Sequence, residues 1–260
     1  MRYDNVAIFK DTMEKCGSIE ALKTSIESSI EGQTFFAADS QSKAVEERRF
    51  ASTKLLLQNK RSFQAAVGLE GRVCVHNFAS FTHPGGGVAK GSTAQEECLC
   101  RISTLYPCLN SDYALSNFYS RHKGFGSPLF NSDVLYTPGV KVFKTDAVMP
   151  MTLPENLWYD VDVVTCAAPN LMKVRISDKE LLSIHTERLG RIFNAAYAVG
   201  ADSLVLGAFG CGVFKNNPKI VAQASVEVAG MYDGCFDRIV FAIPASNDNS
   251  NYWEFERALK

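Results

Sequence analysis

The stretch RVCVHNFASFTHPGGGVAKGSTAQEE, residues 72–97, joins a strand-like run to a glycine-rich loop and then to the start of a helix. Its apolar first half predicts a buried strand, and Pro84 with the glycines that follow predicts a loop. Three consecutive glycines permit backbone geometries that other residues resist. After a spacer of seven residues, the triplet Gln-Glu-Glu opens a helical pattern. The stretch is therefore one strand–loop–helix unit.

Strands, loops and helices alternate in this way along most of the chain. Apolar, strand-like runs lie at residues 52–59, 72–80, 159–170, 201–214 and 236–244. Helical patterns lie at residues 5–30, 60–71, 94–109, 177–200, 217–230 and 249–260. Residues 132–146 predict a hairpin with a Pro-Gly turn. This alternation predicts an α/β domain whose mostly parallel or mixed sheet lies between layers of helices.

The composition is that of a soluble globular protein. The 260 residues are 46% hydrophobic and 21% charged, and the net charge is −1. This balance provides no broadly basic surface for nucleic acid, although it is compatible with a local site for a small anion. The N-terminus lacks an apolar signal core, and no run of 18 apolar residues is present to span a membrane. We therefore expect a cytoplasmic protein that does not enter a membrane.

The cysteines and histidines form no recognisable metal or nucleophile pattern. None of the eight cysteines belongs to a Cys-x-x-Cys pair, and several lie in strand-like runs, so we expect free, buried thiols. Cys98, Cys100 and Cys108 lie close together but lack zinc-ligand spacing, so no metal or cofactor is predicted. We expect His122 and His185 at the surface.

Three polar or glycine-rich segments follow three of the predicted strands, at residues 77–91, 165–170 and 207–214. In α/β sheets, ligands bind outside the carboxyl ends of the strands, so these segments surround one cleft if their strands are neighbours. Glycines in residues 207–214 let backbone N–H groups approach a phosphate, although a tight strand-to-helix turn explains them equally well. Asn77 also allows two interpretations: its side chain contacts a ligand, or it caps a nearby backbone group.

The segment STAQEE, residues 92–97, also allows two interpretations. Ser92 with Gln95, or Thr93 with Glu96, fits the capping-box pattern, which would explain Gln95 or Glu96 as a helix cap without a catalytic role. Glu97 is left unexplained by this pattern. If both acids are buried beside an anionic ligand, at least one pKa is raised, which suits a general acid.

The segment NFASFTHPGGGVAKGSTAQEE resembles the signature of bacterial-type poly(ADP-ribose) glycohydrolases, namely three glycines, a spacer and Gln-Glu-Glu. The segments TCAAPN and GAFGCGVFKNNP resemble two further loops of that family, in the same order. The resemblance implies a macrodomain-like, three-layer α/β/α sandwich with a mixed central sheet and an N-terminal helical extension. It also implies an accessory helical segment at residues 1–44, packed on an ADP-ribose glycohydrolase domain at residues 45–260.

The resemblance implies a role for each matching residue. Glu97 corresponds to the catalytic acid, and Glu96 corresponds to a contact with a ribose hydroxyl. The remaining substrate-binding residues implied by it are Asn77, Gly85, Gly86, Gly87, Gln95, Gly210, Cys211, Gly212, Val213 and Phe214. The glycines at 85–87 belong to the loop beside the distal ribose, and residues 210–214 belong to the loop that binds the diphosphate.

The implied activity is hydrolysis of ribose–ribose O-glycosidic bonds, with release of ADP-ribose. Such a reaction needs a proton for the leaving oxygen and stabilisation of an oxocarbenium-like centre, and one carboxyl group acting first as acid and then as base supplies the proton. The expected partner is ADP-ribose or poly(ADP-ribose) on a modified macromolecule. His83, Lys90 and Cys166 depart from the family pattern. They leave open a mono-ADP-ribosyl hydrolase acting on protein or DNA, and a macrodomain that binds ADP-ribose without cleaving it.

Overall fold

Seven strands form one mixed sheet in the order β1-β4-β5-β3-β6-β7-β2 in the computed structural model, which describes residues 4–124, 126–245 and 250–260. In sheet order, the strands are β1 (Thr34–Phe36), β4 (Val134–Val142), β5 (Tyr159–Cys166), β3 (Val73–Phe78), β6 (Ser203–Leu206), β7 (Arg238–Ala242) and β2 (Lys54–Gln58). The strands from β5 to β2 run parallel, whereas β4 is antiparallel to both β5 and β1. The predicted mixed sheet is confirmed.

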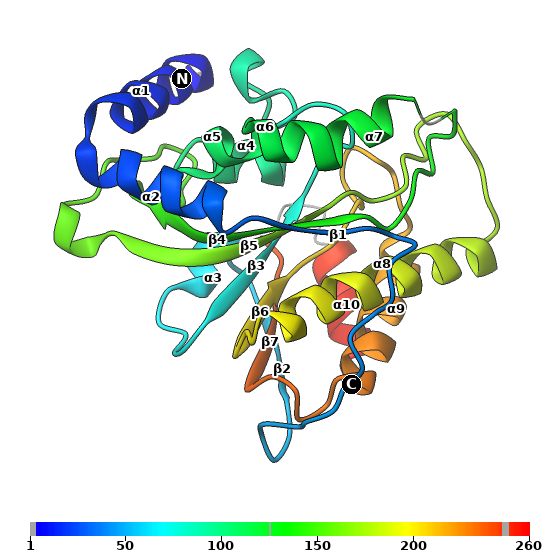
Figure 1. The fold of residues 1–260 in the computed structure, drawn as a ribbon. Helices are drawn as coiled ribbons and strands as arrows, with labels where there is room; N and C mark the ends of the chain where they lie inside the picture. The colour runs from blue at the N-terminus through cyan, green and yellow to red at the C-terminus, as the bar shows by residue number, and fades with distance from the viewer. Residues whose placement is uncertain (1–3, 125, 246–249) are drawn as a thin grey trace.

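Helices cover both faces of this sheet, which gives three layers (Figure 1). One face carries α8 (Asp178–Ala198), α9 (Pro218–Met231) and α10 (Ser250–Ala258). The opposite face carries α1 (Asn5–Ser18), α2 (Glu20–Glu31), α3 (Ser62–Ala66), α4 (Gln95–Cys100), α5 (Leu105–Leu109), α6 (Asp112–Ala114) and α7 (Ser120–Lys123). Among the described helices, none is long and apolar enough to cross a membrane.

Alternate side chains of the central strands enter two separate apolar cores. In β5, Val164 and Cys166 pack in the core beneath α8 and α9, whereas Val161 and Val163 pack in the core on the other face. Strand side chains alternate between faces, so a strand covered on both sides must be apolar at nearly every position. This is the physical reason that the central strands are visible in the sequence as continuous apolar runs.

The predicted hairpin at residues 132–146 is wrong, because this segment is the single strand β4. Its pairing with β5 shifts register between Thr137 and Val140, where Pro138 and Gly139 form a bulge. Gly139 has a φ of +59° and donates its N–H to Asp162 Oδ1 at 3.0 Å. The Pro-Gly pair therefore bends the strand without reversing it, because a side chain of β5 satisfies the freed backbone group.

The predicted helix at residues 94–109 is also wrong, because it is divided into α4 and α5. Between them, Ser103 bridges to Val142 of β4, and Thr104 donates its N–H to the Lys141 carbonyl at 3.0 Å. Pro107 lies inside α5. Pairing with β4 interrupts the helix here, a tertiary effect that helical periodicity cannot show.

The N-terminal segment is helical up to residue 31 and then contributes a strand. The predicted helical pattern at residues 5–30 is confirmed, and it is divided into two helices at Ile19. Residues 34–36, for which no strand is predicted, form the edge strand β1 and pair with β4. The division of the chain at residues 44 and 45 stays a prediction, and part of the first segment is a strand of the shared sheet.

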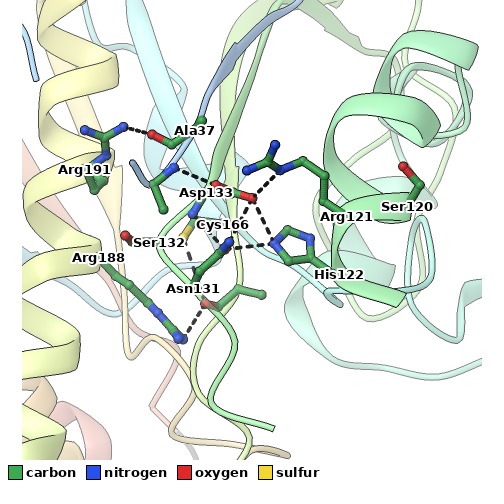
Figure 2. Close-up of polar contacts among 12 residues, drawn as sticks. Ala37, Ser120, Arg121, His122, Asn131, Ser132, Asp133, Cys166, Arg188 and Arg191 are labelled. Carbon is green, nitrogen blue, oxygen red and sulfur yellow. Dashed lines mark hydrogen bonds and ion pairs between the residues drawn. The ribbon is translucent and has the colours of Figure 1, made fainter. Parts of the chain in front are cut away.

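A buried carboxylate fastens this N-terminal segment to the rest of the domain (Figure 2). Asp133 accepts hydrogen bonds from the Ala38 N–H at 2.6 Å and from Asn131 Nδ2 at 3.1 Å. Its Oδ2 also lies 3.3 Å from Arg121 Nε and 3.2 Å from His122 Nε2. His122 is fully buried, so its expected surface position is wrong. Because Ala38 follows β1, Asp133 joins this segment to the turn that precedes β4.

Replacing Asp133 is expected to destabilise the fold substantially. Asp133→Ala leaves buried donors without their acceptor, so the free energy of unfolding should fall by about 3 kcal/mol, as for other broken buried ion pairs. Asp160, which pairs with Lys141 at 2.6 Å and is half exposed, provides the control. Asp160→Ala should cost about 0–1 kcal/mol. Urea denaturation of both variants measures the difference, and equal losses would contradict the role of Asp133.

The same carboxylate makes stability depend on pH in the acid range. Burial on its own would raise the pKa of Asp133, but hydrogen bonds from His122, Ala38 and Asn131 outweigh burial and hold the pKa below its ordinary value. The stabilisation is therefore complete above about pH 4 and lost as the pH falls through the folded-state pKa.

Candidate active site

Three loops meet at one edge of the sheet because β5, β3 and β6 are parallel neighbours. The loops follow Cys166, Phe78 and Leu206, the last residues of these strands. They surround a cleft of about 1060 Å³. A cleft of this size is large enough for a nucleotide-sized ligand. The expected convergence of the three segments is confirmed.

Gln95 fixes the start of α4 against β3. Its Nε2 donates to the His76 carbonyl at 2.7 Å and to Ser62 Oγ at 3.0 Å, and its Oε1 accepts the Phe78 N–H at 2.9 Å. The N-cap position of α4 is Ala94, and no side chain caps the helix there. The capping-box reading of residues 92–97 is therefore wrong, and Gln95 acts as a bridge between helix and strand.

Both oxygens of the Glu96 carboxyl group are engaged inside the protein. Oε2 accepts the Ser80 N–H at 2.8 Å, and Oε1 lies 3.3 Å from Asn77 Nδ2. Burial raises the pKa of Glu96 to about 8, with a smaller contribution from the charge of Glu97, although the hydrogen bonds from Ser80 and Asn77 oppose the shift. Of the two acids, Glu96 is the one whose two carboxyl oxygens both accept hydrogen bonds from the protein.

Glu97 differs because only one of its oxygens accepts a hydrogen bond from the described part of the chain. Oε1 accepts the Gly87 N–H at 2.9 Å. Oε2 is buried and has no hydrogen-bond partner within the described part of the chain. The side chain lines the cleft and is 8% exposed. A buried, unpaired carboxylate oxygen is costly, so its presence at a cleft marks a group poised to meet a substrate.

The first glycine loop lies close against this carboxylate. Gly86 has a φ of +58°, and a Cβ placed on it would lie 2.5 Å from Glu97 Oε1. A Cβ on Gly87 would collide with Ser92 Oγ. Gly85, with a φ of +65°, faces Tyr106 and does not line the cleft, whereas the next two glycines do. The loop therefore needs glycine both for its backbone geometry and for its close approach to the acid.

Asn77 lies beneath the cleft, and its expected contact with a ribose stays a prediction. It is fully buried, does not line the cleft, and donates to Glu96 and, at 3.4 Å, to Thr165 Oγ1. Thr165 is its register partner on β5, so the pairing of the two strands brings the side chains together. Asn77 acts on the site by orienting Glu96.

The second glycine loop is held from below by a side chain that the sequence patterns did not reveal. Asn216 Nδ2 donates to the Gly210 carbonyl at 3.0 Å and to the Pro169 carbonyl at 2.9 Å. Its Oδ1 contacts His185 Nε2 at 2.9 Å, and His185 is fully buried, so its expected surface position is also wrong. Asn216 thus joins two of the three loops, while Cys211, Gly212, Val213 and Phe214 line the cleft above it.

Arg61 and Asp146 also line the cleft and were missed by sequence reasoning. Asp146 pairs with Arg61 Nε at 2.6 Å and accepts the Phe63 N–H at 3.1 Å at the start of α3. The two residues are distant in sequence, so no local pattern indicates their pairing. Among the described residues, no group of three or more His, Cys, Asp or Glu side chains is arranged to hold a metal ion.

A mixed sheet between two helix layers, with glycine loops and a carboxylate pair at the strand ends, defines a macrodomain-like protein with a glycosidase-type site. Residues 7–145 match the microbial-type PARG catalytic domain. This match spans more than half of the chain, and the chain belongs to that family of glycoside hydrolases. Comparison with curated proteins gives no match.

Solved structures of the family are similar over nearly the whole chain. Poly(ADP-ribose) glycohydrolase from Thermomonospora curvata is 29% identical, with a TM-score of 0.87 over 99% of this chain and 100% of that chain. The structure of that protein bound to the inhibitor ADP-HPD has a TM-score of 0.84 at 29% identity, covering 98% and 99% of the two chains. The Deinococcus radiodurans enzyme in complex with ADP-ribose is 31% identical, with a TM-score of 0.82 over 90% and 97%.

The raised pKa of Glu96 predicts an unusual pH dependence of stability. The folded protein keeps the Glu96 proton up to about pH 8, whereas the unfolded chain releases it near pH 4.5. The free energy of unfolding should therefore fall as the pH rises between these values, by at most about 1.4 kcal/mol per pH unit. Glu96→Gln should remove this dependence, measured by urea denaturation across the range. Exposed Glu20→Gln is the matched control, and an unchanged slope in Glu96→Gln would contradict the assignment.

Proposed function

We propose that this chain hydrolyses the ribose–ribose O-glycosidic bonds of poly(ADP-ribose) and releases ADP-ribose, with Glu97 as general acid and base. The observation that carries the proposal is the carboxyl group of Glu97, which lines the cleft and whose buried Oε2 has no hydrogen-bond partner within the described residues. The family membership and the relatives that bind ADP-ribose and ADP-HPD support the substrate class.

The reaction can be written with Glu97 as the single proton-transfer group. The protonated carboxyl group gives its proton to the leaving ribose oxygen as the glycosidic bond breaks, and positive charge develops at the distal ribose. The carboxylate then takes a proton from water as the water oxygen bonds to that carbon. The Gly87 N–H, 2.9 Å from Oε1, holds the carboxyl group in place during both steps.

Glu96 supports this chemistry as a positioning residue. Because the pKa of Glu96 is raised to about 8, its carboxyl group is mostly neutral at pH 7. A neutral Glu96 places no negative charge beside Glu97 or the substrate diphosphate. Its O–H can donate to a ribose hydroxyl or to Asn77 Oδ1, which is buried and has no other partner among the described residues.

The second glycine loop is suited to the diphosphate. The N–H groups of Gly210, Gly212, Val213 and Phe214 have no hydrogen-bond acceptor within the described part of the chain. Free N–H groups on consecutive residues form a concavity that binds anions. Held there, the diphosphate shares one cleft with Glu97, and its negative charge favours the positive charge that develops at the distal ribose.

We also propose the finer assignments that accompany this function. Residues 1–44 act as an accessory segment, supported by the packing of α1 and α2 against the sheet layer. The substrate is carried on modified macromolecules, and the compartment is reducing and cytoplasmic. Eight cysteines without a disulfide, six of them buried, support the reducing environment.

Glu97→Gln is expected to abolish release of ADP-ribose from a poly(ADP-ribose)-modified protein, with a loss of at least about 100-fold in kcat. The amide keeps the shape of the side chain but cannot transfer the proton, so affinity for ADP-ribose should change little. A gel-based release assay and calorimetry measure the two quantities. Exposed Glu31→Gln is the matched control. Full activity in Glu97→Gln would overturn the mechanism, and binding without hydrolysis by the native protein would favour a non-catalytic module.

Gly212 provides a test of the diphosphate loop. A Cβ on Gly212 meets no atom within 4 Å, so Gly212→Ala should fold and bind normally. Gly212→Glu adds a carboxylate at the anion site, and its affinity for ADP-ribose should fall by at least about tenfold because of like-charge repulsion. Calorimetry on the two folded variants makes the comparison, and equal affinities would refute this placement of the diphosphate.

A further inference from the structure

A second cavity, of about 680 Å³, opens beside the catalytic cleft. It shares four lining residues with the cleft, namely Arg61, Lys90, Thr93 and Cys98. Cys98 follows Glu97 on α4, and Lys90 lies three residues after Gly87, which holds the Glu97 carboxylate. None of the residues at 207–214 or 242–251 that line the cleft lines the second cavity. The two cavities therefore meet at the acid end, away from the diphosphate loop.

The lining of the second cavity is cationic although the protein as a whole has a net charge of −1. Three cations, Arg61, Lys90 and Arg101, face one carboxylate, Asp4. Asp4 already accepts the N–H groups of Val6 and Ala7 as the cap of α1. Arg61 is neutralised by Asp146, so the excess of positive charge comes from the other two cations.

Lys90 and Arg101 have no carboxylate within ion-pair distance in the described ranges of the chain. Lys90 is exposed at the junction of the cavities. Arg101 is only 3% exposed, and its guanidinium group donates to the Ser92 carbonyl and to Cys98 Sγ, both neutral acceptors. A buried guanidinium without a counter-ion leaves a positive field in the cavity, and this field favours an anion.

We propose that the second cavity is a subsite for the leaving group, where it binds the diphosphate of the neighbouring ADP-ribose unit across the scissile bond. The proposal rests on the proposed function, because Glu97 marks the position of that bond. A chain that continues past Glu97 away from the diphosphate loop enters the second cavity first. There, the positive charges of Lys90 and Arg101 attract the next diphosphate. The exposed apolar side chain of Val148 also lines this cavity.

This subsite also gives the N-terminal helix a part in recognition. Asp4, Asn5 and Val6 form one wall of the second cavity, and Asn5 Nδ2 donates to the Gly91 carbonyl at 3.2 Å. The helix thus supports the loop that carries Lys90. The subsite distinguishes a polymer, whose leaving group carries phosphates, from a single ADP-ribose on an uncharged acceptor.

Val148 allows the charge of the subsite to be changed without touching the catalytic cleft, because it is 69% exposed and lines only the second cavity. The probe is a dimer of ADP-ribose joined by the ribose–ribose bond, bound to protein carrying Glu97→Gln so that it stays intact. In this background, Val148→Glu should weaken dimer binding by about fivefold, and Val148→Lys should strengthen it, because the added charges act oppositely on a phosphate. Affinity for ADP-ribose alone should stay the same in both variants.

Met231→Glu is the matched control, because Met231 is 59% exposed and lines neither cavity. Calorimetry gives the affinities, and circular dichroism checks that each variant is folded. Equal dimer affinities for Val148→Glu, Val148→Lys and the Glu97→Gln parent would overturn the subsite, as would equal changes for dimer and ADP-ribose. Hydrolysis of the dimer by the native protein is measured separately. Failure of hydrolysis would overturn the proposed function, while the binding comparison still decides the subsite.

Discussion

The site depends on the attachment of α4 to β3 through Gln95. This helix has six residues and no side-chain cap, so its own hydrogen bonds hold it weakly. The Gln95 amide bonds to backbone groups on either side of Asn77, the His76 carbonyl and the Phe78 N–H. Those bonds set the start of the helix against the end of the strand. The attachment of Gln95 therefore also positions Glu96 and Glu97, because the side chains of consecutive helical residues point in fixed relative directions.

The two adjacent acids acquire different properties from this one attachment. Glu96 also lines the cleft, but it is almost fully buried and is hydrogen-bonded to Asn77 and the Ser80 backbone, so burial raises its pKa and keeps the carboxyl group mostly protonated near neutral pH. Glu97 points to the cleft, where the glycine loop contacts one oxygen and leaves the other without a partner. The side chains are chemically identical, so the different roles proposed for them rest on their surroundings alone. The same helix then leads through Cys98 to Arg101, which connects the acid to the cationic second cavity.

Much of the fold could be predicted from local patterns. The strands of the central sheet are buried on both faces and are therefore continuous apolar runs, and α8 is bounded by the Ser177 cap and by Gly200 with a φ of +77°. Two of the failed predictions have a common cause. The Pro-Gly pair in β4 and the break between α4 and α5 are both settled by hydrogen bonds to distant residues, Asp162 and Lys141. Local propensity carries no information about such partners.

For the site, the sequence by itself determined which chemical groups were available and their order along the chain. Two acids after a glycine loop, and a second glycine loop after another strand, are local features that follow from the residue types. Only the tertiary structure decided that Asn77 orients Glu96, that Asn216 joins two loops, and that Arg101 is buried without a counter-ion. The burial of a group and its distance from hydrogen-bonding or charged neighbours determine its protonation state and whether its polar atoms are hydrogen-bonded. Both depend on segments that meet only when the sheet has formed.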